Sequence, residues 1–433
     1  MDSNRTTAFY ILRDIEEKKS YSNIAINRHV EKNDPDSTAF VRELVYGTLR
    51  NKIRIDYILG TLLRDPLEKT DTNCLIILRM GIYQIMGMSS VPDYAAVDES
   101  VKFAKKFARG RESFVNGVLR SYLREKDKIE FPKREDDLTE YLSIKYSFLP
   151  WIIELWMKEL GEQAAEKLLM ASNQTPRLTL RANTLKIGRE QLMKRLEDKG
   201  VEVIASDMSK DTVHVGGGNI VKADLYRNGY YSIQDDSSCL AVQVLDPQPE
   251  ELIMDVCAAP GGKSLAIAER MGNRGQVMSY DIYIRKLREI KENANRLGVS
   301  IIQTKSWDSR RTDSEFAGKA HRVIVDAPCS ALGLIRRKPE IKYKEWNHKM
   351  AIDLPKTQYD ILKASSVYLK AGGTLVYCTC TLSQMENEKV VKRFLQAHPF
   401  FSKEEEMILL PSVNHTNGFY ICKLKKSSNI AAG

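Results

Sequence analysis

The chain has 433 residues, 43% of them hydrophobic and 28% charged, and a net charge of +9. This length exceeds what one hydrophobic core usually serves, so two or three domains are expected. No apolar run approaches the roughly 20 residues that cross a bilayer, and seven cysteines at irregular spacings do not make a disulfide framework. The composition therefore excludes a membrane-spanning or disulfide-rich secreted protein and predicts a cytoplasmic one, while the positive charge leaves nucleic acid binding open.

Residues 1–128 are expected to form a helical domain. The stretch 37–63 carries apolar residues at helical spacing, including Val41 and Leu44. The pattern continues in "CLIILRMGIYQIM", "AAVDESVKFAKKF" and "SFVNGVLRSYLRE", and no strand pattern interrupts it. The run 102–111, "KFAKKFARGR", is basic without any acid, which is typical of a nucleic acid contact or of a solvated face.

The middle of the chain, 138–235, is expected to hold two helices followed by a small α+β module. The charged stretch 125–137 before it lacks periodicity and is interpreted as a linker. Strand patterns occur at 177–186 and 211–217, and the helical pattern "REQLMKRLEDKG" lies between them.

Residues 236–428 alternate short β runs with longer helices, which predicts a parallel, doubly wound α/β sheet. Such a sheet binds ligands at the carboxyl ends of its strands, near the point where the strand order reverses. The expected strands are 252–256, 275–281, 300–304, 322–327 and 372–378.

The stretch "DVCAAPGGKS", 255–264, connects the first of these strands to a helix. It is not a P-loop, because that motif needs a glycine where Cys257 stands, and it does not fit the three-glycine dinucleotide fingerprint. What remains is a turn of small residues whose backbone can approach a ligand closely. The turn residues expected to bind a cofactor are Cys257, Ala258, Ala259, Pro260, Gly261, Gly262 and Lys263.

Acidic residues end successive strands of the expected sheet. Asp255 ends the first, Asp281 ends the second and could accept hydrogen bonds from ribose hydroxyls, and Asp308 follows the third, where it could meet an adenine. Each alone would more often be a helix cap or a solvated turn residue. Together, and without a phosphate cradle, they favour an adenosine ligand that lacks phosphates, and S-adenosylmethionine is the candidate.

Two cysteine motifs, "DAPCSALG" (326–333) and "VYCTCTLSQMEN" (376–387), follow the last two strands, so they are expected at the same rim as the cofactor turn. Zinc is disfavoured, because no CxxC spacing exists and the histidines are scattered. A disulfide between Cys378 and Cys380 would close a strained small ring. Cys378 ends an apolar run and fits the core, whereas Cys380 stands among polar residues, which favours a nucleophile.

The motifs "DVCAAPGGKS", "DAPCSALGLIRRKPEIKY" and "YCTCTLSQMENE" resemble motifs I, IV and VI of the RNA 5-methylcytosine methyltransferases, most closely the bacterial RsmB (Sun, Fmu) type that modifies 16S ribosomal RNA. The N-terminal helices resemble the NusB-like RNA-binding domain of such enzymes, and "RLTLRANTLK" resembles the start of their small, RRM-like α+β segment. The resemblance implies a Rossmann-like class I methyltransferase domain that uses S-adenosylmethionine.

The resemblance also implies roles for three residues. Cys380 would add to carbon 6 of a cytosine, Asp326 would bind the cytosine ring beside the cofactor, and Cys329 would serve the release of the methylated base. Two departures are noted: "SALG" follows Cys329 where the family commonly has a threonine before the glycine, and Cys378 replaces a common alanine. Neither departure touches a residue with an assigned role.

RNA contacts are expected where cations and aromatic residues occur together. "RRKPEIKYKEW" offers such a run, although a solvated charged face would look the same, and "RANT" adds two polar candidates. The residues expected to contact RNA are Arg181, Asn183, Arg336, Arg337, Lys338 and Tyr343, with Trp346 as a further stacking candidate.

Three alternatives stay open at this stage. Cys329 could be the nucleophile, as in DNA cytosine methyltransferases; the substrate could be a transfer RNA or 23S ribosomal RNA; or the chain could be a non-catalytic RNA-binding or assembly factor. The expected partner is 16S ribosomal RNA, protein-free or in an early small-subunit particle, and the expected state is a monomer without a metal.

Overall fold

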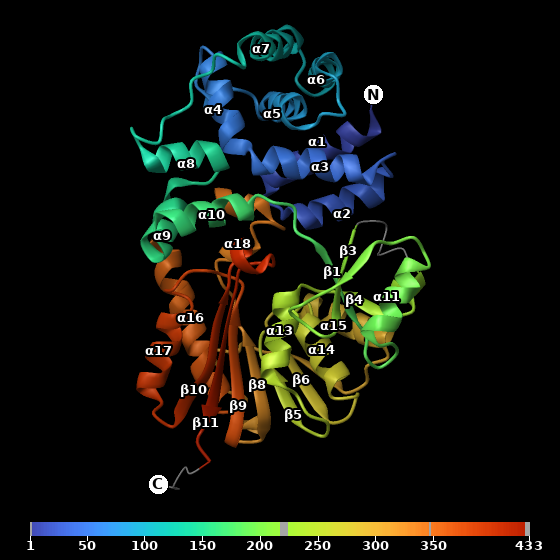
Figure 1. Cartoon of the computed structure of the whole chain (residues 1–433), viewed down its shortest axis with the longest axis vertical. Helices are drawn as coiled ribbons and strands as arrows, with labels where there is room; N and C mark the ends of the chain where they lie inside the picture. Colours follow the sequence, from blue (N-terminus) through green and yellow to red (C-terminus); the bar gives the residue numbers. More distant parts are fainter. Residues whose placement is uncertain (1, 217–223, 346–347, 429–433) are drawn as a thin grey trace. The chain divides into compact units, whose positions relative to one another are not determined.

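The computed structural model describes residues 2–216, 224–345 and 348–428 (Figure 1). Trp346 therefore lies outside the described residues. The chain divides into two compact units, one of residues 1–174 with 335–345, the other of residues 175–334 with 346–433. This grouping differs from the three predicted ranges, because the helices of 138–172 belong to the first unit and the small sheet to the second.

The first unit is helical, as the sequence predicts. Helix α5 is its centre: it is apolar all round and most of its residues are buried, while the Asp71 side chain caps its start by accepting a hydrogen bond from Cys74 N at 3.0 Å. The helices are α1 (Ser3–Lys18), α2 (Ser22–Asn33), α3 (Thr38–Arg50), α4 (Lys52–Leu62), η1 (Leu67–Lys69), α5 (Thr72–Gly87), α6 (Asp93–Phe107), α7 (Glu112–Glu125), α8 (Leu138–Tyr146), α9 (Pro150–Leu160) and α10 (Glu162–Ser172).

A segment from far along the chain completes this helical unit. Residues 335–345 contain the short helix η5 (Pro339–Tyr343), and Lys342 within it is fully buried. The Lys342 ammonium donates hydrogen bonds to Arg50 O at 2.8 Å, Tyr146 O at 2.9 Å and Asn173 Oδ1 at 2.8 Å. One cation thus satisfies acceptors at the ends of three helices, which fixes the segment in the unit.

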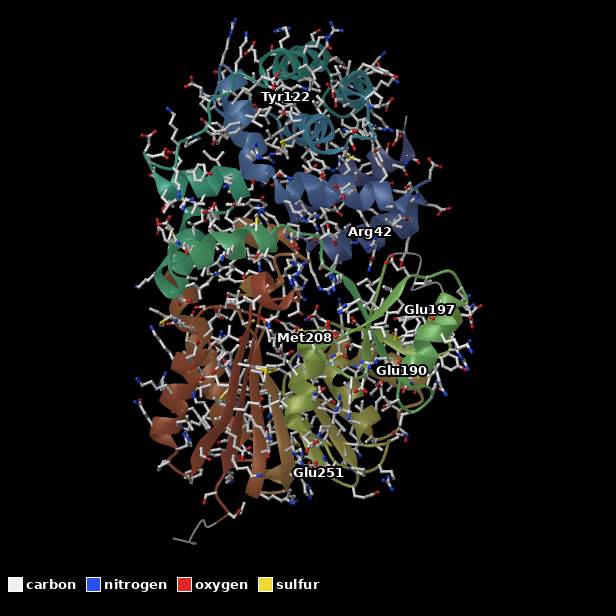
Figure 2. All side chains as sticks on the ribbon, in the orientation of Figure 1. Arg42, Tyr122, Glu190, Glu197, Met208 and Glu251 are labelled. Carbon is white, nitrogen blue, oxygen red and sulfur yellow. The ribbon has the colours of Figure 1, made fainter. Side chains whose placement is uncertain are left out.

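The second unit contains a small antiparallel sheet in the order β2-β3-β1-β4. Its strands are β1 (Leu178–Ala182), β2 (Val203–Ala205), β3 (Thr212–Val215) and β4 (Tyr231–Ile233). Helix α11 (Arg189–Glu197) covers it with Leu192 and Leu196, while Glu190 and Glu197 lie on its exposed side (Figure 2). Strands β2 and β4 were not predicted, because three residues are too few to show an alternation.

A mixed sheet in the order β10-β11-β9-β8-β5-β6-β7 forms the rest of this unit (Figure 1). Its strands are β5 (Leu252–Asp255), β6 (Gln276–Asp281), β7 (Ile302–Ser306), β8 (Ala320–Asp326), β9 (Leu369–Thr379), β10 (Phe401–Leu409) and β11 (Phe419–Lys426). Besides α11, the helices of the second unit are α12 (Asp224–Arg227), which lies against β4, α13 (Asp236–Leu245), α14 (Gly262–Arg270), α15 (Ile284–Leu297), α16 (His348–Ser366), α17 (Glu388–Ala397) and α18 (Pro411–Asn414). Two short 3-10 helices are η3 (Ser314–Phe316) and η4 (Leu332–Leu334).

The five predicted strands are confirmed as β5 to β9, and they pair in parallel. The prediction of an entirely parallel sheet is wrong, because β10 and β11 add an antiparallel hairpin beside β9. Strand β10 escapes the sequence pattern since it is an edge strand in which only the two end residues are buried. After β5 the chain builds β6 on one side and later β8 on the other, so the strand order reverses at β5.

We expect Lys342→Met to lower the free energy of unfolding by about 2 kcal/mol, because it leaves buried carbonyl oxygens without a donor. Urea unfolding of the full chain measures this change. Lys344→Met is the matched control, since Lys344 is exposed and surface substitutions usually stay within about 0.5 kcal/mol. Equal stability of the two variants would contradict a structural role for Lys342.

Candidate active site

A cavity of about 400 Å³ opens where the parallel strands end. Loops after β5, β6, β7, β8 and β9 all contribute to its wall, as the topology requires. The predicted residues that it brings together are Cys257, Ala259, Asp281, Asp308, Asp326, Cys329 and Cys380. Its wall also includes Ile282, Tyr283 and Trp307, which the sequence patterns did not single out. They could have been found from the sequence, because Ile282 and Tyr283 directly follow Asp281 and Trp307 directly precedes Asp308.

The turn after β5 is shaped by Asp281. Its Oδ2 accepts a hydrogen bond from Ala259 N at 3.1 Å and its Oδ1 accepts one from Tyr283 N at 2.9 Å. Gly261 has a φ of 101°, and a Cβ there would lie 2.8 Å from Ile290 Cγ1, so only glycine fits. A carboxylate with two acceptor oxygens keeps lone pairs for ribose hydroxyls, so the turn and Asp281 fit an adenosine ligand.

The other two strand-end acids have different surroundings. Asp255 is fully buried, its Oδ2 accepts a hydrogen bond from Ser264 Oγ at 2.6 Å, and burial raises the pKa of its carboxyl to about 7. Asp308 is half-buried and pairs with Arg310 at 2.6 Å, and this hydrogen-bonded cation lowers the pKa of its carboxyl. Asp255 is therefore a buried residue that links the end of β5 to Ser264 of α14. Asp308, in contrast, lines the cavity as a charged hydrogen-bond acceptor.

The sulfurs of Cys329 and Cys380 lie 3.1 Å apart. Both line the cavity, Cys329 from the loop after β8 and Cys380 from the loop after β9. Cys378 differs from them: it is fully buried, packs in the hydrophobic core, and burial raises the pKa of its thiol well above the ordinary value. Of the two neighbouring cysteines in "CTC", only Cys380 is placed to react.

Asp326 lines the same cavity as the two sulfurs and forms an ion pair with Lys263, whose Nζ is 2.6 Å from its Oδ2. Burial acts to lower the pKa of the Lys263 ammonium, but the Asp326 carboxylate outweighs it and holds the pKa above its ordinary value. The Asp326 side chain is 32% exposed, against 9% for Lys263. Asp326 thus stays accessible to a ligand as a hydrogen-bond acceptor, while the buried Lys263 ammonium balances its negative charge.

Arg181 and Asn183 are not available to RNA in this structure, because both are buried. The Arg181 guanidinium pairs with Glu269 at 2.8 Å and also donates to Gly262 O at 3.0 Å and to Gln234. Asn183 Nδ2 donates to Leu297 O at 2.8 Å. "RANT" therefore joins the small sheet to the cofactor turn and to α15, and the expected RNA contacts there are not supported.

The other expected RNA residues belong to the helical unit. Arg336 is buried, with Nε 3.5 Å from Gln174 O, and the Tyr343 hydroxyl donates to Leu49 O. Both therefore serve packing of the segment 335–345. Arg337 and Lys338 are half-buried, and Lys338 Nζ lies 4.8 Å from the centre of the Tyr21 ring.

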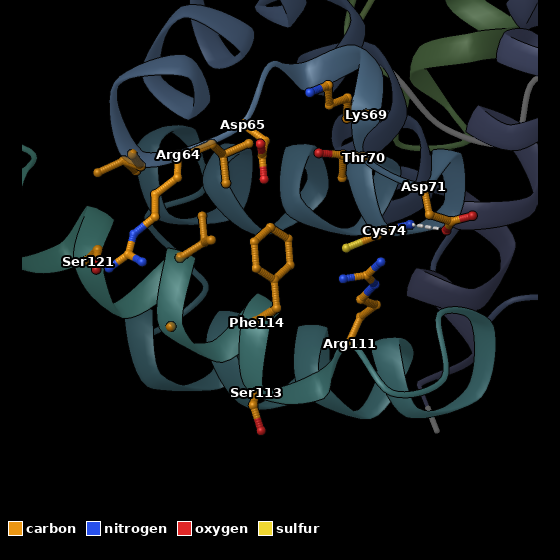
Figure 3. A pocket seen from close by; sticks show the side chains of 14 residues that line it. Arg64, Asp65, Lys69, Thr70, Asp71, Cys74, Arg111, Ser113, Phe114 and Ser121 are labelled. Atoms are coloured by element: carbon orange, nitrogen blue, oxygen red, sulfur yellow. Dashed lines mark hydrogen bonds between the residues drawn. The ribbon is translucent and has the colours of Figure 1, made fainter.

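A larger cavity, of about 580 Å³, lies in the helical unit between the α4–α5 connection and α7 (Figure 3). Phe114 projects into it, and Arg111 and Cys74 lie beside the ring (Figure 3). Burial raises the pKa of the Cys74 thiol to about 11, so Cys74 is a poor nucleophile. The two cysteines whose sulfurs lie close together are thus in the smaller cavity.

Two structural findings bear on other classes of function. Across residues 2–216, 224–345 and 348–428, no three His, Cys, Asp or Glu side chains are grouped so that they could hold a metal ion. In the same described part of the chain, no helix combines the length and apolar character needed to cross a membrane.

Comparison with known proteins gives three matches to family models along the chain. Residues 242–425 match the family described as 16S rRNA methyltransferase RsmB/F. Residues 2–124 match the NusB family, and residues 150–221 match the ferredoxin-like domain of the RsmF/B-like methyltransferases.

Curated relatives match over nearly the whole chain. The probable ribosomal RNA small subunit methyltransferase B of Bacillus subtilis is 37% identical, over 98% of this chain and 99% of its own. The ribosomal RNA small subunit methyltransferase B of Proteus mirabilis is 31% identical, over 92% of each chain. The solved structure of PH0851 shares the fold, with a TM-score of 0.85 at 24% identity over 98% of both chains. The chain therefore belongs to the 16S rRNA methyltransferase RsmB/F family.

Proposed function

We propose that this protein transfers a methyl group from S-adenosylmethionine to carbon 5 of a cytosine in 16S ribosomal RNA, through a covalent bond between Cys380 and carbon 6. The observation that carries the proposal is the pair of sulfurs 3.1 Å apart in a cavity that Asp326 and Asp281 also line. A base must leave its stack to reach them, which favours a single-stranded target.

The first step is attack by the Cys380 thiolate on carbon 6. The ring electrons move toward N3, which takes up a proton from water, and carbon 5 becomes an enamine carbon. Asp326 accepts a hydrogen bond from the N3–H or the amino group and compensates the charge that develops there. S-adenosylmethionine would supply an electrophilic methyl group: carbon 5 would bond to it with the enamine electron pair, and the sulfur would keep the electrons of the broken methyl–sulfur bond.

Release needs a base for the carbon 5 proton, and Cys329 is placed for that step. The hydrogen bond and charge of Cys380, together with burial, raise the pKa of the Cys329 thiol well above its ordinary value. Once Cys380 is bonded to carbon 6 its charge and its thiol hydrogen bond are gone, which removes part of the rise in pKa, so Cys329 loses its proton to water more readily than before. Its thiolate then removes the carbon 5 proton, the C–H electron pair restores the ring double bond, Cys380 leaves as a thiolate, and N3 returns its proton.

Substituting each cysteine separately tests these roles. Cys380→Ala should lower methyl transfer by at least about a thousandfold and form no covalent complex, whereas Cys329→Ala should accumulate a protein–RNA complex on a denaturing gel. Cys422→Ala, on β11 and outside both cavities, is the control that should do neither. The opposite pattern would make Cys329 the nucleophile and contradict the proposal.

Asp281→Ala should raise the dissociation constant for S-adenosylmethionine about tenfold, because it removes both the ribose acceptor and the partner of Ala259 N. Titration calorimetry measures the constant. Asp281→Asn keeps one acceptor oxygen, so its dissociation constant should lie between those of the wild type and Asp281→Ala. A constant within twofold of the wild type would show that the cofactor binds elsewhere.

The RNA target is tested by bisulfite sequencing of ribosomal RNA from cells with and without this chain. We expect one or a few cytosines of 16S RNA to lose protection when the chain is absent. No difference anywhere in 16S RNA would favour a different RNA or a non-catalytic binding role.

We further propose that the helical unit binds an unpaired nucleotide of the RNA in its own cavity. Phe114 is 37% exposed and offers a face for base stacking. Arg64, Lys69 and Arg111 line the same cavity together with Asp65 and Asp71, so its lining carries a net positive charge. Arg111 also ends the basic run 102–111, so a phosphate beside the stacked base would meet positive charge.

Phe114→Ala should weaken RNA binding about tenfold, since stacking contributes roughly 1–3 kcal/mol per base. Arg111→Ala should weaken binding. It should also make the slope of log K against log salt concentration less steep by about 0.7, the value for one phosphate contact to a single strand. Fluorescence anisotropy with a single-stranded RNA measures both. Arg120→Ala, also exposed on α7 but outside the cavity, is the control; equal loss in all three variants would contradict a specific site.

A further inference from the structure

Glu386 is a buried carboxylate that connects the two cysteine loops. It lies between β9 and α17, is 0% exposed, and does not line the cavity. Its Oε2 accepts a hydrogen bond from Ser330 N at 2.9 Å, and its Oε1 accepts from Ser330 Oγ at 2.5 Å and from Thr381 Oγ1 at 3.4 Å. Ser330 follows Cys329 and Thr381 follows Cys380, so one carboxylate bridges the residues directly after both sulfurs.

Gln358 on α16 extends this connection to the other side of Cys329. Its side chain is fully buried, and its Nε2 donates to Pro328 O and to Glu386 Oε2, both at 2.9 Å. The residues before and after Cys329 are therefore fixed by one carboxylate–amide pair.

The backbone of Glu386 is itself held by the sheet. Tyr377, which is fully buried on β9, donates its hydroxyl hydrogen to Glu386 O at 2.6 Å. The next residue, Asn387, donates from Nδ2 to Thr381 O at 3.1 Å. Because β9 fixes the backbone of Glu386, the hydrogen bonds of its carboxylate fix the two loops relative to that strand.

The two loops depend on this carboxylate to different degrees. Ser330, beside Cys329, makes two short hydrogen bonds to Glu386, whereas Thr381, beside Cys380, makes one of 3.4 Å and otherwise meets the Ser330 hydroxyl at 2.6 Å. Cys380 has an additional backbone anchor that does not involve Glu386: Gly333, four residues after Cys329, donates from its N to Cys380 O at 3.0 Å. A Cβ on Gly333 would lie 1.9 Å from Gly418 O, so this backbone contact leaves no room to shift.

We infer that Glu386 is a positioning residue that holds Cys329 at its distance from Cys380, so that release of the methylated base depends on it more than the attack does. The inference rests on the proposed function, in which Cys329 takes the carbon 5 proton. Misplacing a reacting group by about 1 Å can cost on the order of a hundredfold in rate. Without the carboxylate, the buried Ser330 N–H and one of the two Gln358 amide hydrogens would lack an acceptor, while the other still reaches Pro328 O. Leaving such donors buried and unpaired is costly, so we expect the Cys329 loop to shift.

The test is a single-turnover reaction of the full chain with a 16S RNA transcript under reducing conditions, in which covalent complex and methylated product are followed separately. In Glu386→Ala the complex should form within about threefold of the wild-type rate but decay roughly 10–100-fold more slowly, with the KM for RNA changed less than twofold. Glu386→Gln keeps one acceptor oxygen and should be intermediate.

Glu388→Gln is the matched control, since Glu388 lies two residues further on and, among the described residues, makes no hydrogen bond to either cysteine loop. If Glu386→Ala does not fold, Glu386→Gln and Gln358→Leu carry the same test. Decay at the wild-type rate in these variants would overturn the inference, as would an equal loss of complex and product, which reports only fewer folded molecules. Absence of a covalent complex from both the wild type and Cys329→Ala would overturn the proposed function, and this inference with it.

Discussion

The pairing of β8 with β9 is the interaction on which the site depends. Cys329 and Cys380 are 51 residues apart in sequence, yet their sulfurs lie 3.1 Å apart. The two strands run in parallel with Asp326 opposite Cys378, so the loops that follow them leave the sheet side by side. A covalent mechanism that needs one thiol for attack and another group for release can therefore be built from two loop residues on a rigid scaffold.

The same topology gives three similar acids three different environments. Asp255, Asp281 and Asp308 each end or follow a parallel strand. Asp255 is buried under the turn, Asp281 holds the turn through two backbone N–H groups, and Asp308 pairs with an arginine at the edge. Burial and hydrogen bonding, rather than residue type, decide which acid can meet a ligand.

The catalytic sheet and its site could be predicted because strand–helix alternation and the cysteine motifs are local patterns. Strand β10 of the hairpin could not, since an edge strand whose interior is one lysine followed by three glutamates carries no buried face to detect. The structural roles of Arg181 and Lys342 could not be predicted either, because the acceptors of each cation lie on segments that are distant in sequence. Burial of such a cation therefore removes it from the candidates for RNA contact, whereas Arg111 stays exposed.

The most direct measurement of the central claim is the mass of the peptide that carries the trapped base. The full chain would be incubated with S-adenosylmethionine and a target RNA containing 5-fluorocytidine, which blocks removal of the group at carbon 5, and then digested with nuclease and protease. The account predicts a methylated fluorocytidine attached to the peptide that contains Cys380, with Cys329 unmodified. Attachment at Cys329, or no attachment to either peptide, would contradict it.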